Sequence, residues 1–287
     1  MPPGETVMLQ AGHTRIAATR TGTPDRPAVL LLHGWPHSRA LYDGVVEELG
    51  ATFLVLAMDL PDIGGSRGTA PSAGKTDLAD VLLTAAETIG AHDITIAGLD
   101  VGGMIAFAAA RDQGERVSRA IVMNTVIPGL PPWDALLADP GIWHFAFHAI
   151  DDLPEMLVRG RERSYFDYFH DALASDPAKI PASLRDQFAE AYTRPEALSA
   201  GFDWYRAMSR DAERNARPKT ISTPLFYVRG DADGRAIDIY REGLKKAGAV
   251  NLDTRVVAGA GELLPVEMPA QFIDIVRGFA ATAPVGG

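Results

Sequence analysis

AGLDVGG, from Ala97 to Gly103, gives the strongest indication of the fold in this sequence. It joins the apolar run DITIAGL to GGMIAFAAARDQG, a helix-like segment closed by Gly114. A turn that passes directly from a buried strand into a helix needs small residues on both sides of its central residue, here Asp100. Such a turn exposes the central side chain in a strained conformation at a helix N-terminus, which favours negative charge. The stretch therefore predicts an aspartate displayed at a strand–helix elbow, and an ordinary glycine-rich turn is the alternative.

The flanking sequence alternates strands with helices. The apolar runs PAVLLLHG and TFLVLAMDL are typical of buried strands, and RAIVMNTV, TPLFYVRG and LDTRVV predict further strands. TDLADVLLTAAETIG has helical spacing, and Thr76, Asp77 and Asp80 mark its start. TVMLQ and HTRIAATR predict two further strands joined by a turn at Gly12. The alternation predicts an α/β fold with a mainly parallel sheet of about eight strands covered by helices on both faces.

One region, from about residue 127 to 217, breaks this alternation. It opens with the turn-rich IPGLPPWD, contains no strand pattern, and holds 13 of the 22 aromatic residues. This enrichment predicts a helical lid over an apolar cleft, although a small helical subdomain also needs aromatics for its own core. We therefore expect residues 1–127 and 218–287 to form the α/β core and residues 128–217 to form the lid.

Composition narrows the function. The chain has 287 residues, a net charge of −10 and no cysteine. The acidic balance argues against nucleic acid and anionic membranes as partners, and the absence of cysteine excludes disulfides and thiolate chemistry. No signal peptide or membrane span is expected, so the predicted location is the cytoplasm. We expect a small-molecule substrate and no cofactor or metal, and the sequence leaves a homodimer open.

The aspartate at the centre of the elbow selects a class of chemistry. A carboxylate is suited to attack a saturated carbon that carries a leaving group, such as an epoxide or a carbon–halogen carbon. The product is an ester of Asp100 that must then be hydrolysed. HGWPHS, from His33 to Ser38, can aim a backbone N–H at the developing oxyanion, and a cis bond between Trp35 and Pro36 would fix this loop.

Five motifs together resemble one family. HGWP, DLPDIGGS, GLDVGG, GDAD and GAGELLPVEMP, with a helical lid between the third and the fourth, are similar to the epoxide hydrolase branch of the α/β-hydrolase superfamily. The resemblance runs through nearly the whole chain and implies the α/β-hydrolase fold. It also implies that Asp100 is the nucleophile and that the backbone N–H groups of Trp35 and Val101 form the oxyanion hole.

The resemblance extends into the lid. Tyr205, in DWYR, falls where the family places a tyrosine that donates to the epoxide oxygen, and His144, in WHF, falls near the second donor. A structural tyrosine and a core histidine are the respective alternatives. The remaining residues expected to bind substrate are Trp143, His148, Asn124, Leu99 and Pro36.

The acid partner of the base is less well defined by the sequence. Asp233 of GDADG matches the family acid, and Asp231 is a close second. Some relatives carry an acid after the preceding strand, where this chain has Asn124, which can hydrogen-bond but cannot carry the charge. Leu99 stands where the family commonly has a histidine before the nucleophile.

Glu262, in GAGELLPVEMP, is the largest departure from the family because it stands where the base histidine is expected. Glutamate, with a pKa near 4.3, is about two units weaker as a base than histidine, although a dry pocket or nearby carboxylates can raise its pKa. Mutual repulsion among Asp100, Asp233 and Glu262 would leave one of them protonated, giving an acid beside a base. An exposed loop residue without a role is the alternative.

Four functions stay open at this stage. The first is an epoxide hydrolase-like hydrolase that uses Glu262 as its base, acting on a sizeable apolar molecule of secondary metabolism. The second is a non-hydrolytic enzyme that opens or closes a ring, eliminates water or isomerises with the same carboxylates. The third is a ligand-binding protein that has lost the chemistry, and the fourth is a variant whose base was removed to trap an intermediate. We favour the hydrolase.

Overall fold

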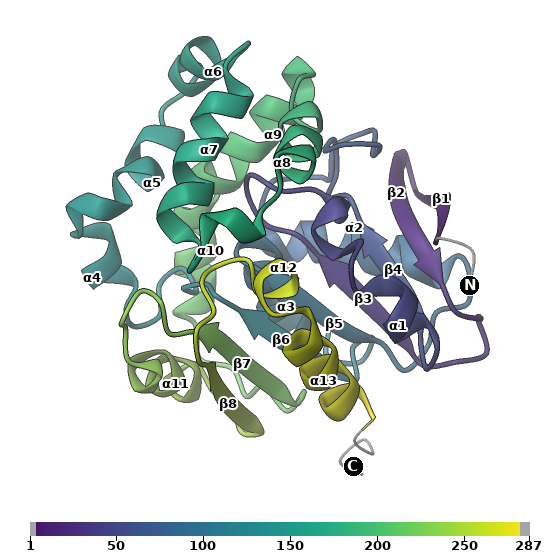
Figure 1. Cartoon of the computed structure of the whole chain (residues 1–287). Helices are drawn as coiled ribbons and strands as arrows, with labels where there is room; N and C mark the ends of the chain where they lie inside the picture. The colour runs from purple at the N-terminus through teal and green to yellow at the C-terminus, as the bar shows by residue number, and fades with distance from the viewer. Residues whose placement is uncertain (1–3, 282–287) are drawn as a thin grey trace.

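A computed structural model describes residues 4–281 of the chain. Its centre is an eight-stranded sheet in the order β1-β2-β4-β3-β5-β6-β7-β8 (Figure 1). The strands from β3 to β8 pair in parallel, and β1 and β2 complete the sheet in antiparallel pairing. The strand bounds are β1 Glu5–Ala11, β2 Thr14–Thr21, β3 Ala28–Leu32, β4 Leu54–Met58, β5 Thr95–Leu99, β6 Arg119–Met123, β7 Leu225–Gly230 and β8 Leu252–Val257.

Helices cover both faces of the sheet because its central strands are apolar on both sides. Val29 and Leu31 of β3 join the core cluster that contains α1 (Val46–Gly50) and α13 (Pro269–Ala280). Leu30 and Leu32 point the other way, as the period of two in a strand requires, and pack with α2, α3 and α11. The bounds of these helices are α2 Lys75–Glu87, α3 Val101–Asp112 and α11 Ile237–Lys246.

The segment between β6 and β7 is helical throughout and lies over the sheet at the top of Figure 1. Its elements are α4 Trp133–Leu137, η2 Pro140–Ile142, α5 Trp143–His148, α6 Leu153–Val158, α7 Glu162–Leu173, η3 Pro177–Lys179, α8 Ala182–Glu190, α9 Pro195–Arg206 and α10 Met208–Asn215. Its aromatics close around Trp35 of the core, whose ring centroid lies 4.4 Å from that of His148 and 5.0 Å from that of Phe169. The lid and the α/β core therefore share one apolar cluster.

The predicted α/β-hydrolase fold is confirmed, down to the strand expected from each apolar run and the tight turn at Gly12. Pro269 begins α13 as predicted, and the Trp35–Pro36 peptide bond is cis. The start of α2 differs by one residue from the expectation, because Gly74 is the N-cap and Asp77 instead accepts a hydrogen bond from Ser72 at 2.6 Å. Within residues 4–281 we find no helix with the length and apolarity that crossing a membrane requires.

Candidate active site

Asp100 lies at a sharp elbow between β5 and α3, with φ 53° and ψ −121°. The turn closes this tightly because its neighbours are glycines. A Cβ added to Gly98 would lie 1.9 Å from the carbonyl oxygen of Gly102, and one added to Gly102 would lie 2.2 Å from that of Leu32. The positive φ is a strained conformation for aspartate, and such strain is typical of functional sites.

The carboxylate of Asp100 is held by backbone donors. The N–H of Trp35 donates to its Oδ2 at 2.8 Å, and the N–H of Val101 is a second donor. Gly34 makes room for this contact, since a Cβ there would lie 2.5 Å from Oδ2. Burial raises the pKa of Asp100 to about 6, although both N–H groups and the charge of buried Lys75 oppose the rise.

A cavity of about 210 Å³ lies in front of Asp100, between the carboxyl edge of the sheet and the lid. Its polar lining comes from Asp100, Asn124, Thr125, His144, Tyr205, Tyr227, Arg229, Asp233, Arg235, Tyr240 and Glu262, and its aromatic lining includes Trp35, Phe145 and Phe169. The structure thus brings the expected nucleophile, the unusual glutamate and both predicted lid donors into one cavity. Its volume lies below the roughly 300–1,000 Å³ common for ligand pockets.

Glu262 faces this cavity from the loop between β8 and α12 (Leu264–Glu267). Among residues 4–281 no group donates a hydrogen bond to its carboxyl oxygens, whereas its backbone N–H donates to the carbonyl of Leu173 at 2.9 Å. Burial, reinforced by the negative charges of Asp100 and Asp233, holds the pKa of Glu262 well above its usual value, and Arg229 opposes the rise. The glutamate is therefore neither an exposed loop residue nor a member of a hydrogen-bonded triad.

Two side chains that do not carry out chemistry fix the Glu262 loop. Asn124, at φ 43°, donates to the carbonyls of Glu262 at 2.7 Å and Gly261 at 3.1 Å and accepts from the N–H of Gly230 at 2.9 Å. Although Asn124 lines the cavity, its amide is thus occupied by backbone groups.

Glu267, which is 4% exposed, fixes the loop from the other side. It accepts from the N–H of Gly261 at 3.1 Å, from that of Leu263 at 2.9 Å and from that of Ser175 at 2.8 Å. Because Ser175 belongs to the lid segment after α7, Glu267 ties the lid to the loop that presents Glu262.

Asp233, predicted as the acid that orients the base, has other partners in the structure. Its carboxylate forms an ion pair with Arg229 and a second one with Arg235 at 3.3 Å. Asp231, the other candidate, accepts from the N–H of Gly259 at 2.8 Å and so stabilises a turn. Neither carboxylate is hydrogen-bonded to Glu262; Asp233 acts on it only through its charge.

The two lid donors differ in their surroundings. Tyr205 of α9 is buried, lines the cavity, and forms no hydrogen bond through its hydroxyl within the described residues. Burial and the adjacent charge of Asp100 hold the pKa of Tyr205 well above its ordinary value, so the phenol keeps its proton. Burial lowers the pKa of His144 to about 4, which leaves its imidazole neutral, and its Nδ1 has no partner. Each can therefore donate one proton to a ligand oxygen.

Four residues predicted to bind substrate do not line this cavity. Trp143 turns outward and is 41% exposed, its ring 6.0 Å from that of Tyr168. His148 is fully buried against Trp35 and is hydrogen-bonded to the hydroxyl of Tyr165 at 2.7 Å. Leu99 lies in the core on the α13 side of the sheet, and Pro36 serves the loop through its cis bond.

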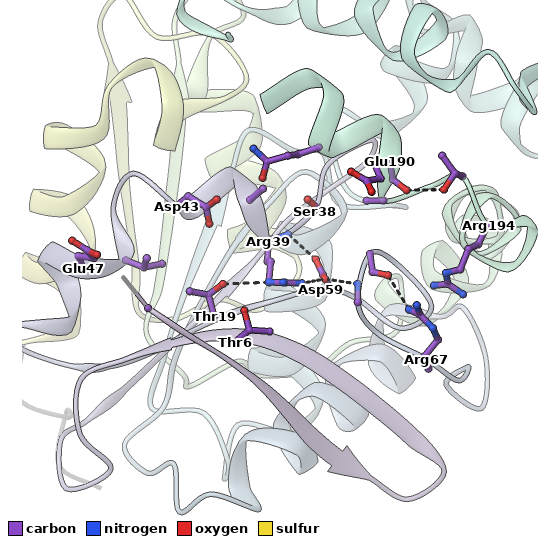
Figure 2. A pocket seen from close by; sticks show the side chains of 18 residues that line it. Thr6, Thr19, Ser38, Arg39, Asp43, Glu47, Asp59, Arg67, Glu190 and Arg194 are labelled. Atoms are coloured by element: carbon purple, nitrogen blue, oxygen red, sulfur yellow. Dashed lines mark hydrogen bonds and ion pairs between the residues drawn. The ribbon is translucent and has the colours of Figure 1, made fainter. Parts of the chain in front are cut away.

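A larger, open groove of about 730 Å³ lies elsewhere, between the β1–β2 hairpin and the α8–α9 segment (Figure 2). Its charged side chains are largely engaged with the protein itself. Arg39 forms an ion pair with buried Asp59, and Arg67 donates to the carbonyls of Gly64 and Ser66. None of the residues predicted for catalysis lines this groove.

Three residues with a role at the site had no place in the sequence-based prediction. Gly34 makes room for the Asp100 carboxylate, Glu267 fixes the loop, and Arg229 is a cation beside Glu262. The His-Gly pair after a buried strand was a sequence signal for Gly34. The arginine inside the otherwise apolar TPLFYVRG was a sequence signal for Arg229. Nothing local distinguished Glu267 from an ordinary residue of a helix.

Several known proteins with sequences similar to this chain are named as hydrolases. The family described as alpha/beta hydrolase fold matches residues 27–150. The chain is 26% identical over 263 residues to the soluble epoxide hydrolase of Corynebacterium sp. (strain C12), covering 88% of this chain and 90% of that protein. It is also 24% identical over 283 residues to carboxylesterase YbfK of Bacillus subtilis (strain 168), covering 92% and 82% respectively. The crystal structure of wild-type Cfl2 from Burkholderia cenocepacia matches with a TM-score of 0.86 at 28% identity, over 96% of this chain and 95% of that one. The chain thus has the α/β-hydrolase fold and homologues that include epoxide hydrolases and esterases.

Proposed function

We propose that the chain is a hydrolase of the epoxide hydrolase type, in which Asp100 attacks the substrate and Glu262 activates water. One observation carries the proposal: the carboxylate of Asp100 sits at the elbow against the N–H of Trp35, in the same cavity as Tyr205 and Glu262. A serine at this position would favour an esterase, whereas a carboxylate favours displacement at a saturated carbon. The similarity to named epoxide hydrolases supports the same choice.

The first step forms an ester. An oxygen of ionised Asp100 attacks one epoxide carbon, the carbon–oxygen bond of the ring breaks, and its electron pair stays on the former epoxide oxygen. Tyr205 donates its proton to that oxygen, and His144 is placed to donate a hydrogen bond to it. This step requires an ionised Asp100 and a protonated Tyr205. At neutral pH the pKa of Asp100, about 6, favours the carboxylate, and the pKa of Tyr205, held well above its ordinary value, keeps the phenol protonated.

The second step hydrolyses the ester. Glu262 takes a proton from water as the water oxygen attacks the carbonyl carbon of the ester. The developing oxyanion lies where Oδ2 of Asp100 accepts from Trp35, so this N–H and that of Val101 stabilise it. Collapse of the intermediate breaks the ester bond and releases a diol, with the proton held by Glu262 passing to the leaving oxygen and the proton of the regenerated Asp100 carboxyl returning to the phenolate of Tyr205. A glutamate whose pKa is raised by burial and by neighbouring negative charge is a stronger base than an ordinary one.

A second candidate function rests on the same glutamate. A raised pKa also favours the protonated form of Glu262, which suits it to donate a proton to a leaving oxygen beside Asp100. That arrangement favours a ring opening, dehydration or isomerisation without water. We rank it second because Tyr205 and His144 already supply donors on the lid side of the cavity.

Oxygen-18 distinguishes the two candidates. We expect single turnover of a compact epoxide such as styrene oxide in H₂¹⁸O to give a diol without label, because the first oxygen transferred comes from Asp100. Later turnovers should give labelled diol, and mass spectrometry should locate ¹⁸O in the peptide that contains Asp100. A product without any solvent oxygen after many turnovers would favour the non-hydrolytic candidate. Binding without any product would contradict both.

A further inference from the structure

Lys75 is a buried cation for which the proposed reaction has no step. It is the first residue of α2, on the core side of the boundary with the lid, and it is 2% exposed. Burial holds the pKa of its ammonium group below the ordinary value, although the negative charges of Asp211 and Asp100 oppose the fall. Enclosing an ammonium group is costly unless its partners are close and well oriented, so the partners of Lys75 indicate its role.

Both partners of the Lys75 ammonium group belong to the lid. Nζ donates to the carbonyl of Trp204 at 2.5 Å and forms an ion pair with Oδ2 of Asp211 at 2.9 Å. The carbonyl of Trp204 lies in the last turn of α9, where the carbonyls of a helix lack partners within the helix and a cation is favourable. Lys75 therefore binds the C-terminal end of the helix that carries Tyr205.

The contact between core and lid is reciprocal. Gly74, the N-cap of α2, offers no side chain, and the backbone N–H of Lys75 donates instead to Oδ1 of Asp211 at 3.1 Å. Asp211 lies in the first turn of α10 and is 7% exposed. A core residue thus binds the end of α9 and a lid residue binds the start of α2, which fixes the corner between α9 and α10 against the core.

The residue that Lys75 holds directly precedes the lid donor. Tyr205 follows Trp204 in α9, and among residues 4–281 its hydroxyl has no hydrogen-bond partner that could fix it in the cavity. The indole of Trp204 packs against His33, with 6.2 Å between the ring centroids. The place of the Tyr205 phenol therefore depends on the backbone of α9, which Lys75 holds at Trp204.

We propose that Lys75 is a positioning residue: through the carbonyl of Trp204 it holds α9 so that the hydroxyl of Tyr205 meets the former epoxide oxygen. This inference rests on the proposed function for the chemistry of Tyr205 and on the contacts of Lys75 for its place. Lys75 does not line the cavity and so acts only through α9. A displacement of about 1 Å at a distance from the chemistry can cost on the order of 10²-fold in rate.

Lys75→Met keeps the length of the side chain and removes the donor. At pH 8, above the pKa of about 6 of Asp100, rapid quench should show ester formation from saturating styrene oxide slowed about 10-fold. Hydrolysis of the ester should change by less than about twofold, because Tyr205 serves the first step. Ester formation at the wild-type rate in Lys75→Met would overturn the inference.

A double-mutant cycle tests whether Lys75 acts through Tyr205. Lys75→Met combined with Tyr205→Phe should form ester as fast as Tyr205→Phe alone, because the hydroxyl that Lys75 positions is already absent. Losses that add in the combined variant would show that Lys75 acts by another route and would overturn the inference.

Arg111→Met is the matched control. Arg111, on α3, is also a buried core cation, and its Nη2 donates to the carbonyls of Arg214 at 2.8 Å and Arg217 at 2.9 Å, near the end of α10. Its loss should lower the urea midpoint of unfolding, as in Lys75→Met, but should leave ester formation within about twofold of the wild type. An equal loss of ester formation in both variants would show a general effect of a weakened lid and would overturn the role of Lys75.

A charge-balanced variant covers a fold defect in Lys75→Met, which leaves Asp211 buried without its cation. Lys75→Met combined with Asp211→Asn leaves no unpaired charge and keeps an oxygen for the backbone N–H at position 75. This variant should regain most of the lost stability and still form ester slowly. Recovery of the wild-type rate together with the stability would overturn the inference, because the loss would then come from the unpaired charge.

Binding of an unreactive ligand separates this inference from the proposed function. Acetophenone has a carbonyl oxygen that can accept from Tyr205 but no epoxide, and Trp35 in the cavity reports its binding through fluorescence. Its Kd should rise about threefold to tenfold in Lys75→Met and in Tyr205→Phe, without a further rise in the combined variant. This result would support the inference even if no epoxide were hydrolysed, in which case the proposed function fails alone. A wild-type Kd in Lys75→Met would overturn the inference and leave the hydrolase intact.

Discussion

The elbow and the Glu262 loop each deliver a carboxyl to the same cavity, but they hold it in opposite ways. At the elbow, Oδ2 of Asp100 accepts the N–H of Trp35, and glycines keep the surrounding backbone close. In the Glu262 loop the backbone is tied by Asn124 and Glu267, while no described group donates to the Glu262 carboxyl. The protein thus stabilises the ionised carboxylate of Asp100 with a hydrogen bond, whereas for Glu262 it fixes only the position of the backbone.

This difference separates the two roles. Donors to a carboxylate oppose the effect of burial, so the pKa of Asp100 rises only to about 6. Glu262 lacks donors and faces two negative neighbours, so its pKa lies well above the ordinary value. In the proposed mechanism, the residue that must be ionised to attack is the one with donors, and the residue that must exchange a proton with water is the one without them.

The largest effect should follow from removing the charge at the elbow. Asp100→Asn keeps the shape and the backbone contacts but loses the nucleophile, so kcat for the epoxide should fall by on the order of 10⁴-fold or more. Asp253→Asn, an exposed position on β8, is the matched control and should leave kcat unchanged. Turnover at the wild-type rate by Asp100→Asn, with circular dichroism unaltered, would remove Asp100 from the chemistry.

The Glu262 loop should give a smaller but more specific effect. Glu262→Gln keeps the shape of the side chain but removes its ability to accept a proton, so it should lower the overall rate on the order of 10²- to 10³-fold. The loss should fall on ester hydrolysis, so the alkylated enzyme should accumulate and be visible by intact mass. Glu262→His supplies the family base, and faster release of the ester in this variant would sharpen the contrast. Loss of the first step instead, with no ester formed, would identify Glu262 as an acid.

How much of this contrast the sequence could predict differs between the two regions. The elbow was predictable because its geometry is local: glycines on both sides of Asp100 and a strand-to-helix change leave few conformations. The strands were predictable because buried parallel strands are continuous apolar runs, as TFLVLAMDL and β4 show. The position of Glu262 was predictable from its loop, but its lack of hydrogen-bond donors was not.

The missing parts depend on side-chain contacts that no sequence pattern displays. Asp233 was expected beside the base, yet Arg229, four residues earlier, takes it as a partner. In the lid, α5 has only six residues, too few for periodicity to show which face turns inward. Trp143 consequently faces out, whereas Phe145 lines the cavity. The acid partner and the lid contacts were therefore assigned from resemblance rather than from local pattern.

An intermediate effect should come from the lid donor opposite the elbow. Tyr205→Phe removes a hydroxyl that has no other partner, so it should slow ester formation by about 10- to 100-fold without loss of stability. His144→Gln, which alters a neutral donor in the same cavity, should cost less, about threefold to tenfold. Rapid-quench measurement of the alkylated enzyme reads this step directly. An unchanged rate of ester formation in Tyr205→Phe would leave the former epoxide oxygen to another donor.

The smallest effect concerns stability and its dependence on pH. A carboxyl whose pKa is higher in the folded than in the unfolded chain binds more protons when folded, so its contribution to stability is lost as pH rises between those two values. For Asp100 this window runs from the ordinary 3.8 to about 6, and the raised pKa of Glu262 extends it upward. At pH 7 both Asp100→Asn and Glu262→Gln should therefore exceed the wild type in free energy of unfolding, by on the order of 1 kcal/mol.

The gain should shrink at pH 4.5, where the wild-type carboxyls are protonated in the folded state. Urea denaturation of the three proteins at pH 4.5, 6 and 7, with Asp253→Asn as the exposed control, gives the differences directly. A gain that is the same at all three pH values would mean that neither carboxyl is strained by its burial, and the contrast between the elbow and the loop would then be one of position alone.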